Sequence, residues 1–206
     1  MPLDFTAPEL RQRYNQVAPY YDRAEWIIEA VLFGRLRREL FGKARGDLLE
    51  VAVGTGKNLV YSPPNVRITA IDVSEGMLAR ARERAVRLGR AVAFCRMDAQ
   101  ALAFPDASFD TVTSSLSTCT FPDPVAALSE MARVCRPGGQ ILLLEHGRAN
   151  VAAIGRAQDR LADWNARIVG CHWNRPTLDL VQRAGLRLVA VRTHVAGAIT
   201  AIEATP

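Results

Sequence analysis

The sequence predicts a single α/β domain with a seven-stranded, mostly parallel sheet and helices on both faces. Apolar runs that suit strands alternate with amphipathic stretches that suit helices along most of the chain. A turn with two glycines, Gly54 and Gly56, follows the first of these runs, and Asp72 ends the second. The last two runs are joined by a short turn at Ala196-Gly197. Because a helical crossover needs more residues than that turn has, the last two strands must pair antiparallel.

The expected elements follow from the spacing of apolar residues and from the residues that start and stop helices. Strands are expected over residues 47–53, 67–72, 91–96, 109–115, 140–145, 187–194 and 198–204. Helices are expected over residues 8–20, 24–42, 57–61, 75–88, 124–135, 151–168 and 176–184. Ser74 is a favourable N-cap, and Gly89 is favourable at a helix C-terminus. Pro137 and the two glycines after it end the helix that precedes the fifth strand.

Length and composition agree with one globular core. A chain of 206 residues buries enough surface to be stable alone, and we expect residues 1–45 to form a helical lid over a binding unit at 46–206. No apolar run approaches the length of a membrane span. The N-terminus lacks the basic-then-apolar order of a signal peptide. We therefore expect a cytoplasmic protein, with peripheral contact at the inner membrane surface as the alternative.

The four cysteines and the excess of arginine carry further expectations. Cys95, Cys119, Cys135 and Cys171 are scattered and form no Cys-x-x-Cys pair, so we expect reduced thiols and no metal site. The net charge is +5. One basic cluster, at residues 80–90, has the spacing of an exposed helix face. The other precedes the first strand and contains Arg35, Arg37, Arg38, Lys43 and Arg45.

The glycine turn and its neighbouring acids predict a nucleoside-binding site. Gly54 and Gly56 can adopt backbone angles closed to other residues, which lets a ligand approach the main chain. Asp72 would accept hydrogen bonds from ribose hydroxyls at the same crevice. Glu50 precedes the turn, where a carboxylate suits an ammonium or sulfonium group and repels a pyrophosphate. Leu59 occupies the position of the third glycine of a nicotinamide-dinucleotide fingerprint, which disfavours an NAD-dependent oxidoreductase.

Five segments resemble the class I S-adenosylmethionine (SAM) methyltransferases of the methyltransferase type 11 group, in the family's order. They are residues 49–56, 71–78, 97–104, 104–112 and 133–139. The resemblance implies a Rossmann-like fold, SAM as cofactor and contact between Asp98 and the adenine amino group. Ala52 departs from the pattern, since a glycine usually stands there. The cofactor-binding residues expected on this basis are Glu50, Ala52, Gly54, Thr55, Gly56, Asn58, Asp72, Val73, Met77, Asp98, Ala99 and Ser115.

The N-terminal segment carries a second resemblance. Residues 14–22 are similar to the tyrosine-rich opening of the ubiquinone/menaquinone and bacterial phospholipid methyltransferases, in which an N-terminal helix covers the cofactor. This implies a lid in which a tyrosine, Tyr20 being the candidate, closes the site. Apolar residues and arginines follow and form an amphipathic helix with a basic face. The helix is either a plain lid or a lid that also touches an anionic membrane while it loads a lipid-like acceptor.

The acceptor is the part of the function that the sequence leaves open. His146 ends the fifth strand on the cofactor side and is the candidate base or acceptor anchor, against a plain rim histidine. We expect methyl transfer to a small or amphiphilic acceptor: a lipid, quinone, thiol or amine. A phospholipid N-methyltransferase at the membrane surface is one specific form. Glu145-His146 and, more loosely, residues 164–173 resemble the methyltransferase-like thiol methyltransferases. A non-catalytic SAM-binding protein remains the alternative class. Nucleic acid is disfavoured because no Asn/Asp-Pro-Pro-Tyr motif follows the fourth strand.

Overall fold

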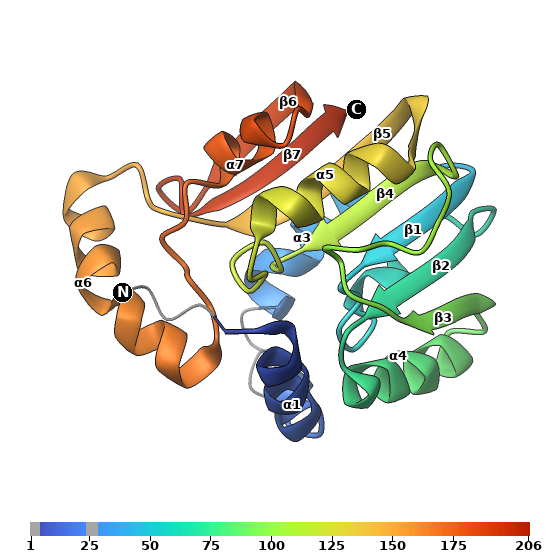
Figure 1. Cartoon of the computed structure of the whole chain (residues 1–206), viewed down its shortest axis with the longest axis horizontal. Helices are drawn as coiled ribbons and strands as arrows, with labels where there is room; N and C mark the ends of the chain where they lie inside the picture. Colours follow the sequence, from blue (N-terminus) through green and yellow to red (C-terminus); the bar gives the residue numbers. More distant parts are fainter. Residues whose placement is uncertain (1–4, 24–28) are drawn as a thin grey trace.

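The computed structural model describes residues 5–23 and 29–206, and its centre is a seven-stranded sheet (Figure 1). The strand order is β3-β2-β1-β4-β5-β7-β6. Neighbouring strands are parallel except that β7 runs antiparallel to β5 and β6. The strands are β1 (Asp47–Val51), β2 (Arg67–Asp72), β3 (Val92–Arg96), β4 (Phe109–Ser115), β5 (Cys135–His146), β6 (Arg187–His194) and β7 (Ile199–Thr205). The predicted fold class, including the antiparallel last strand, is confirmed.

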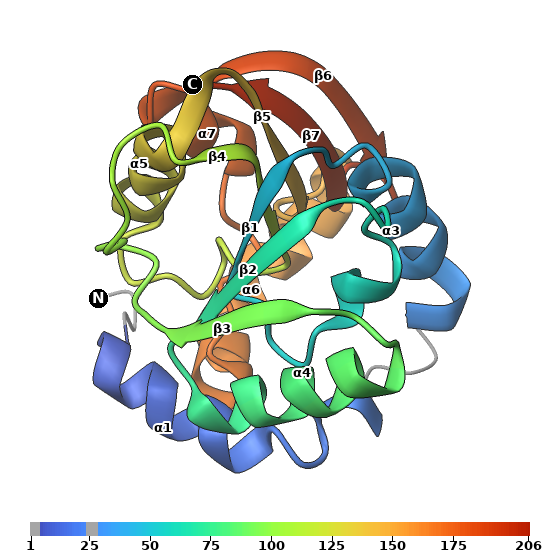
Figure 2. The same ribbon diagram turned by 90° about the vertical axis from the view of Figure 1, so that its right-hand side faces the viewer.

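Helices cover both faces of the sheet, as the view in Figure 2 shows. Helices α5 and α7 pack on one face, where Leu128 and Val181 join the core with Leu49 of β1. Helices α4 and α3 pack on the other, and Leu48, the neighbour of Leu49, belongs to the core under α4. This alternation is the two-residue period of a strand buried on both faces. The helices are α1 (Ala7–Val17), α3 (Gly34–Phe41), α4 (Glu75–Arg87), α5 (Pro124–Val134), α6 (Ala152–Val169) and α7 (Thr177–Arg183).

Most expected elements differ by one to three residues in their bounds, the helix expected over 57–61 is a 3-10 turn (Lys57–Val60, η2), and two other elements differ more. The strand expected over 140–145 begins earlier, because Cys135 pairs with Phe109 before the register shifts and resumes at Gln140. The helix expected over 24–42 lies partly outside the described residues. Its described part consists of one π-helical turn, Glu29–Phe33 (η1), followed by α3.

Residues 5–23 lie over the glycine turn, and α1 docks on α4. The side-chain oxygen of Asn15, in α1, accepts hydrogen bonds from Ser74 Oγ at 2.7 Å and from the Gly76 amide at 2.9 Å. Asp22 accepts one from Thr55 Oγ1 at 2.7 Å. These contacts hold the N-terminal residues directly above the carboxyl ends of β1 and β2.

Helix α6 occupies a different place, at the side of the molecule away from the strands (Figure 1). Val151, Ile154, Leu161 and Trp164 are exposed along it. None of the described helices combines the length and the apolar character that crossing a membrane requires.

Candidate active site

A cavity lies at the carboxyl ends of β1, β2 and β4, where ligands of parallel α/β sheets bind. It encloses about 930 Å³ of empty space, including its open mouth. Every cofactor-binding residue expected from the sequence lines it except Glu50 and Gly56. Ala7, Leu10, Tyr14 and Tyr21 line it from the N-terminal side. The N-terminal residues therefore form part of the cavity wall.

The glycine turn provides the close backbone approach that the sequence predicts. Gly54 has φ +55°, and nothing lies within 4 Å of a Cβ placed there. Gly56 has φ +80°, but an added Cβ would lie 2.9 Å from Leu59, so this glycine serves packing beneath the turn. Ala52 also adopts a left-handed conformation, with φ 54°. The side chain of Ala52 imposes strain there, which the glycine expected from the motif at this position would avoid.

Glu50 is buried behind the wall and is connected to the cavity through polar neighbours. Asn58 Nδ2 donates to Glu50 Oε1 at 2.8 Å and lies 3.0 Å from Ser115 Oγ. Arg37, only 3% exposed, donates to Ser115 Oγ at 2.7 Å and also to the side-chain oxygen of Asn58. Its Nε pairs with Glu29 Oε1 at 2.8 Å. Arg37 is thus a buried part of the site, which corrects its expected place on an exposed basic face.

Burial raises the pKa of two carboxyl groups here. The pKa of Glu50 is raised to about 7 by desolvation, which outweighs the hydrogen bond from Asn58 and the charge of Arg37. The pKa of Asp72 is raised to about 6 by desolvation, which outweighs the hydrogen bonds from the amides of Ser74 and Gly54. A ligand that donates to either carboxylate would replace the lost hydration and favour the charged form.

The two carboxylates that are expected to contact the nucleoside, Asp72 and Asp98, lie at neighbouring strand ends. Asp72 lines the cavity, and its carboxylate accepts a hydrogen bond from the Gly54 amide at 2.8 Å, which holds the carboxylate beside the turn. Asp98 also lines the wall and is held by the Gln100 amide at 2.9 Å. Each carboxylate retains lone pairs for a ligand, because an ionised carboxyl group accepts about four hydrogen bonds.

The loop after β4 forms the opposite wall and rests on Glu145. The Glu145 carboxylate is fully buried and accepts hydrogen bonds from the amides of Ser117 and Thr118 and from the Thr118 hydroxyl. Leu116, at the start of this loop, has φ 53°. Leu116, Ser117, Thr120, Phe121 and Pro122 line the cavity. Glu145 therefore acts as a support that shapes the loop.

The expected catalytic residues lie elsewhere. Tyr20 is 68% exposed and is absent from the lining, whereas Tyr14 and Tyr21 on either side are part of it. His146 is also absent from the lining; its Nε2 lies 3.2 Å from Cys171 Sγ. This arrangement gives neither residue a contact with the cavity. The sequence analysis assigns no contact to two further lining residues: Lys57, which follows the glycine turn, and Met97, which begins the motif segment 97–104.

Comparison with known proteins decides the family. Residues 49–143 match the family model described as a methyltransferase domain. The chain is 38% identical over 146 residues to a phosphatidylethanolamine N-methyltransferase of Cereibacter sphaeroides, covering 66% of this chain and 72% of that protein. The chain belongs to the class I SAM-dependent methyltransferases. This methyltransferase is also 33% identical over 156 residues to the ubiquinone/menaquinone biosynthesis C-methyltransferase UbiE of Bdellovibrio bacteriovorus, covering 72% of this chain and 66% of that one.

A solved structure supports the fold. The [4+2]-cyclase SpnF superposes with a TM-score of 0.77 at 23% identity, covering 96% of this chain and 78% of that one. A likeness at this identity supports the fold of the methyltransferase and nothing about its acceptor.

The residues of the site fit SAM. Glu50 Oε2 is buried and has no hydrogen-bond partner among the described residues, so the methyltransferase keeps an unused acceptor of the kind that an ammonium group requires. The open space at Gly54 leaves the backbone accessible, and Asp72 and Asp98 offer acceptors for ribose and adenine. SAM, when bound, supplies a methyl group activated by its positive sulfur. The chain's own task is to hold and align the two reactants.

Proposed function

We propose that the enzyme transfers the methyl group of SAM to the amine of an amphiphilic, lipid-like acceptor. One observation carries the proposal: the described residues that line the cavity include no histidine, cysteine or glutamate. Their only carboxylates, Asp72 and Asp98, sit where the nucleoside is expected. The described lining therefore offers no histidine, cysteine or glutamate for general-base work, and its lysine, Lys57, forms ion pairs with Asp22 and Glu29.

This absence selects among acceptors by their chemistry. A phenol or an alcohol has to lose a proton to become a good nucleophile, which usually calls for a positioned base. An amine attacks through its neutral form, and its proton can pass to solvent before the acceptor enters the closed site. Alignment of the nitrogen with the methyl group would then supply most of the rate enhancement.

The wall of the cavity supports an acceptor with an apolar portion. Leu10 of α1 faces the same cavity as Leu116, Phe121 and Pro122 of the loop after β4. Apolar lining with a few polar groups is typical of sites for amphiphilic small molecules. The relative from Cereibacter sphaeroides is named for a phospholipid amine, which agrees with this choice. The relative named for quinone C-methylation makes a quinol the second candidate.

Membrane contact is a separate proposal, for which we favour helix α6 over the basic segment before β1. The basic segment before β1 offers less exposed positive charge to a membrane than its sequence implies, because Arg37 is buried. Helix α6 instead exposes Ile154, Leu161 and Trp164 and carries arginines on the same element. Apolar residues beside arginines suit the surface of an anionic bilayer, where a lipid-like acceptor would be collected.

A turnover screen tests the acceptor. The enzyme is incubated with SAM and with mixed micelles containing phosphatidylethanolamine, a demethylated quinol, an alkyl thiol or a phenol, and S-adenosylhomocysteine is measured. We expect product with the phospholipid amine, and less product from Asp72→Ala at the same subsaturating SAM concentration. Turnover confined to the quinol or the thiol would contradict the amine proposal and leave the methyltransferase assignment intact.

A further inference from the structure

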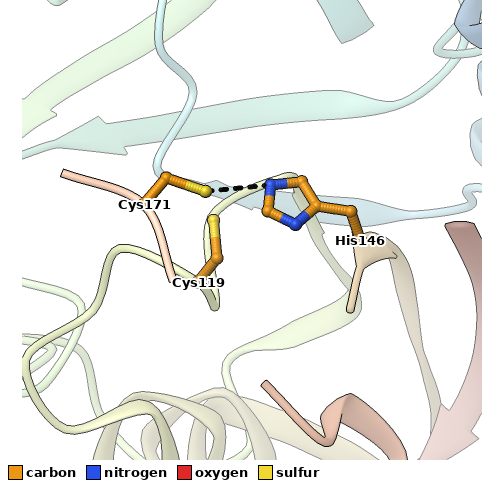
Figure 3. A group of neighbouring side chains, drawn as sticks. All are labelled: Cys119, His146 and Cys171. Carbon is orange, nitrogen blue, oxygen red and sulfur yellow. Dashed lines mark hydrogen bonds between the residues drawn. The ribbon is translucent and has the colours of Figure 1, made fainter. Parts of the chain in front are cut away.

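Three side chains with soft donor atoms meet outside the cavity. Cys119 lies in the loop after β4, His146 is the last residue of β5, and Cys171 follows α6 (Figure 3). Their donor atoms, two sulfurs and one ring nitrogen, all lie within 4.8 Å of one another. Cys119 is 1% exposed and Cys171 9%. Neither the methyl transfer nor the acceptor proposal makes use of this group.

The segments that carry the three residues are joined by further hydrogen bonds. The His172 amide donates to the Cys119 carbonyl at 3.0 Å, which ties the Cys171 segment to the loop after β4. Asn165 Nδ2 donates to the Cys171 carbonyl at 2.6 Å. Thr177 Oγ1 donates to the His146 carbonyl at 3.3 Å. The backbone around the donors is thus fixed by contacts that do not depend on the donors themselves.

We propose that Cys119, His146 and Cys171 form a binding site for a Zn²⁺ ion. Two cysteine sulfurs and an imidazole nitrogen are a ligand set that zinc prefers, and softness of the donors disfavours Mg²⁺ and Ca²⁺. In a tetrahedral zinc site, bonds of about 2.3 Å to sulfur and about 2.0 Å to nitrogen place the donors roughly 3.5–3.8 Å apart. Donors already gathered within 4.8 Å need only small side-chain adjustments to reach that geometry.

Binding has a defined proton balance. Each cysteine that becomes a ligand releases its thiol proton to solvent, and His146 binds through its neutral ring. Two thiolates balance the charge of Zn²⁺, so the buried site becomes neutral overall. Three protein ligands leave the fourth position for a water molecule or a ligand thiolate.

The place of the site suggests what the metal does. Cys119 lies between Ser117 and Thr120, which both line the cavity, and Cys171 belongs to the segment that leads to α7. An ion bound by all three residues would lock the loop after β4 against β5 and the Cys171 segment. Zinc would therefore order the acceptor wall, whichever acceptor the enzyme uses.

Metal analysis of the whole protein tests the site. The protein is reduced, treated with a chelator, desalted, and titrated with Zn²⁺ or with Co²⁺ as a spectroscopic probe. We expect one tightly bound ion per chain, and with Co²⁺ the intense visible absorption of a tetrahedral site with thiolate ligands. We also expect the melting temperature of the parent protein to rise with Zn²⁺, because an ion that binds only the native state stabilises it.

Cysteine variants provide the matched control. Cys171→Ser and Cys119→Ser should each weaken metal binding by more than about tenfold, since even changes outside the ligand shell cost about 10- to 100-fold. Cys135→Ser removes another buried cysteine, outside the group, and should bind as the parent does. A reduced parent protein that holds neither ion, or a Cys171→Ser variant that binds as well as Cys135→Ser, would overturn the proposal. A Cys119–Cys171 disulfide in a protein that binds no metal when reduced would also overturn it and indicate a redox pair.

Discussion

Asn58 Nδ2 donates to Glu50 Oε1 at 2.8 Å and so couples a buried carboxylate in β1 to the wall of the SAM cavity. The second oxygen of Glu50 has no partner within the described part of the chain. Burial of this carboxyl group is a cost to the folded protein, and a cationic group of the cofactor bound near Glu50 would offset it. The buried Glu50 carboxylate should therefore lower the stability of the folded protein and strengthen its binding of the cofactor.

Glu50→Gln tests both effects. The pKa of Glu50 is about 4.5 when unfolded and about 7 when folded, so between these values the native state holds a proton that the unfolded chain has lost. The contribution of Glu50 to the free energy of unfolding is fully present below about pH 4.5. It is lost as the pH rises through the folded-state pKa of about 7. We expect the variant to be more stable than the parent at pH 8 by about 1–2 kcal/mol and to bind SAM more weakly. Urea unfolding at pH 5 and pH 8, with the exposed Glu83→Gln as control, measures the difference. A variant that is less stable than the parent at pH 8 would refute the desolvation argument.

Ala52→Gly tests the strain in the turn. Ala52 has φ 54°, which costs a non-glycine residue roughly 1–2 kcal/mol. Glycine removes that cost but adds about 0.5–1 kcal/mol of chain entropy to the unfolded state. We expect the variant to be as stable as the parent or up to about 1 kcal/mol more stable by thermal unfolding. Ala85→Gly, in the interior of α4, should instead lose about 1 kcal/mol. Equal losses in the two variants would show that Ala52 is not strained.

Asn15→Ala tests the docking of the N-terminal helix. The side chain of Asn15 receives hydrogen bonds from Ser74 and Gly76, at the start of α4. Because Leu10 and Tyr14 of the same helix line the cavity, loosening α1 should open the cofactor site. We expect SAM affinity to fall by about 1 kcal/mol, roughly fivefold, while the exposed neighbour change Gln16→Ala has no effect. Unchanged affinity in Asn15→Ala would mean that α1 does not hold the cofactor.

The sequence alone predicts part of the fold and part of the candidate site. The bounds of β2, β4 and β6 matched because clear turn residues stand before each of these strands. The nucleoside end of the cavity was predictable because its residues follow one another along motif segments. The buried position of Arg37 was not predictable. Its sequence neighbours include other arginines, and nothing in that pattern indicates that Arg37 among them forms hydrogen bonds with Glu29, Asn58 and Ser115. The same holds for Cys119, His146 and Cys171, which are far apart in sequence and meet only through the packing of three segments.

Membrane contact can be assigned to one of two faces. If α6 provides it, changing Leu161 and Trp164 together to alanine should abolish sedimentation with phosphatidylglycerol vesicles. Trp164 is 61% exposed, so its removal should cost little stability. Changing Arg35 and Arg38 together to glutamate, in the basic segment before β1, should then have the smaller effect. A larger loss of sedimentation in the Arg35 and Arg38 variant would favour the basic segment. A parent protein that does not sediment with anionic vesicles would exclude both faces.

Calorimetric titration with S-adenosylhomocysteine and with NAD tests the cofactor site most directly. The carboxylate of Asp72 is held beside the glycine turn and faces the cavity, where ribose hydroxyls would bind it. We predict that S-adenosylhomocysteine binds the parent at micromolar strength and that NAD does not bind. Asp72→Ala should weaken binding by about 1–3 kcal/mol, roughly 5- to 150-fold, whereas the exposed Asp163→Ala should not. Binding of NAD, or equal affinity of Asp72→Ala and the parent for S-adenosylhomocysteine, would contradict the assignment of this cavity to SAM.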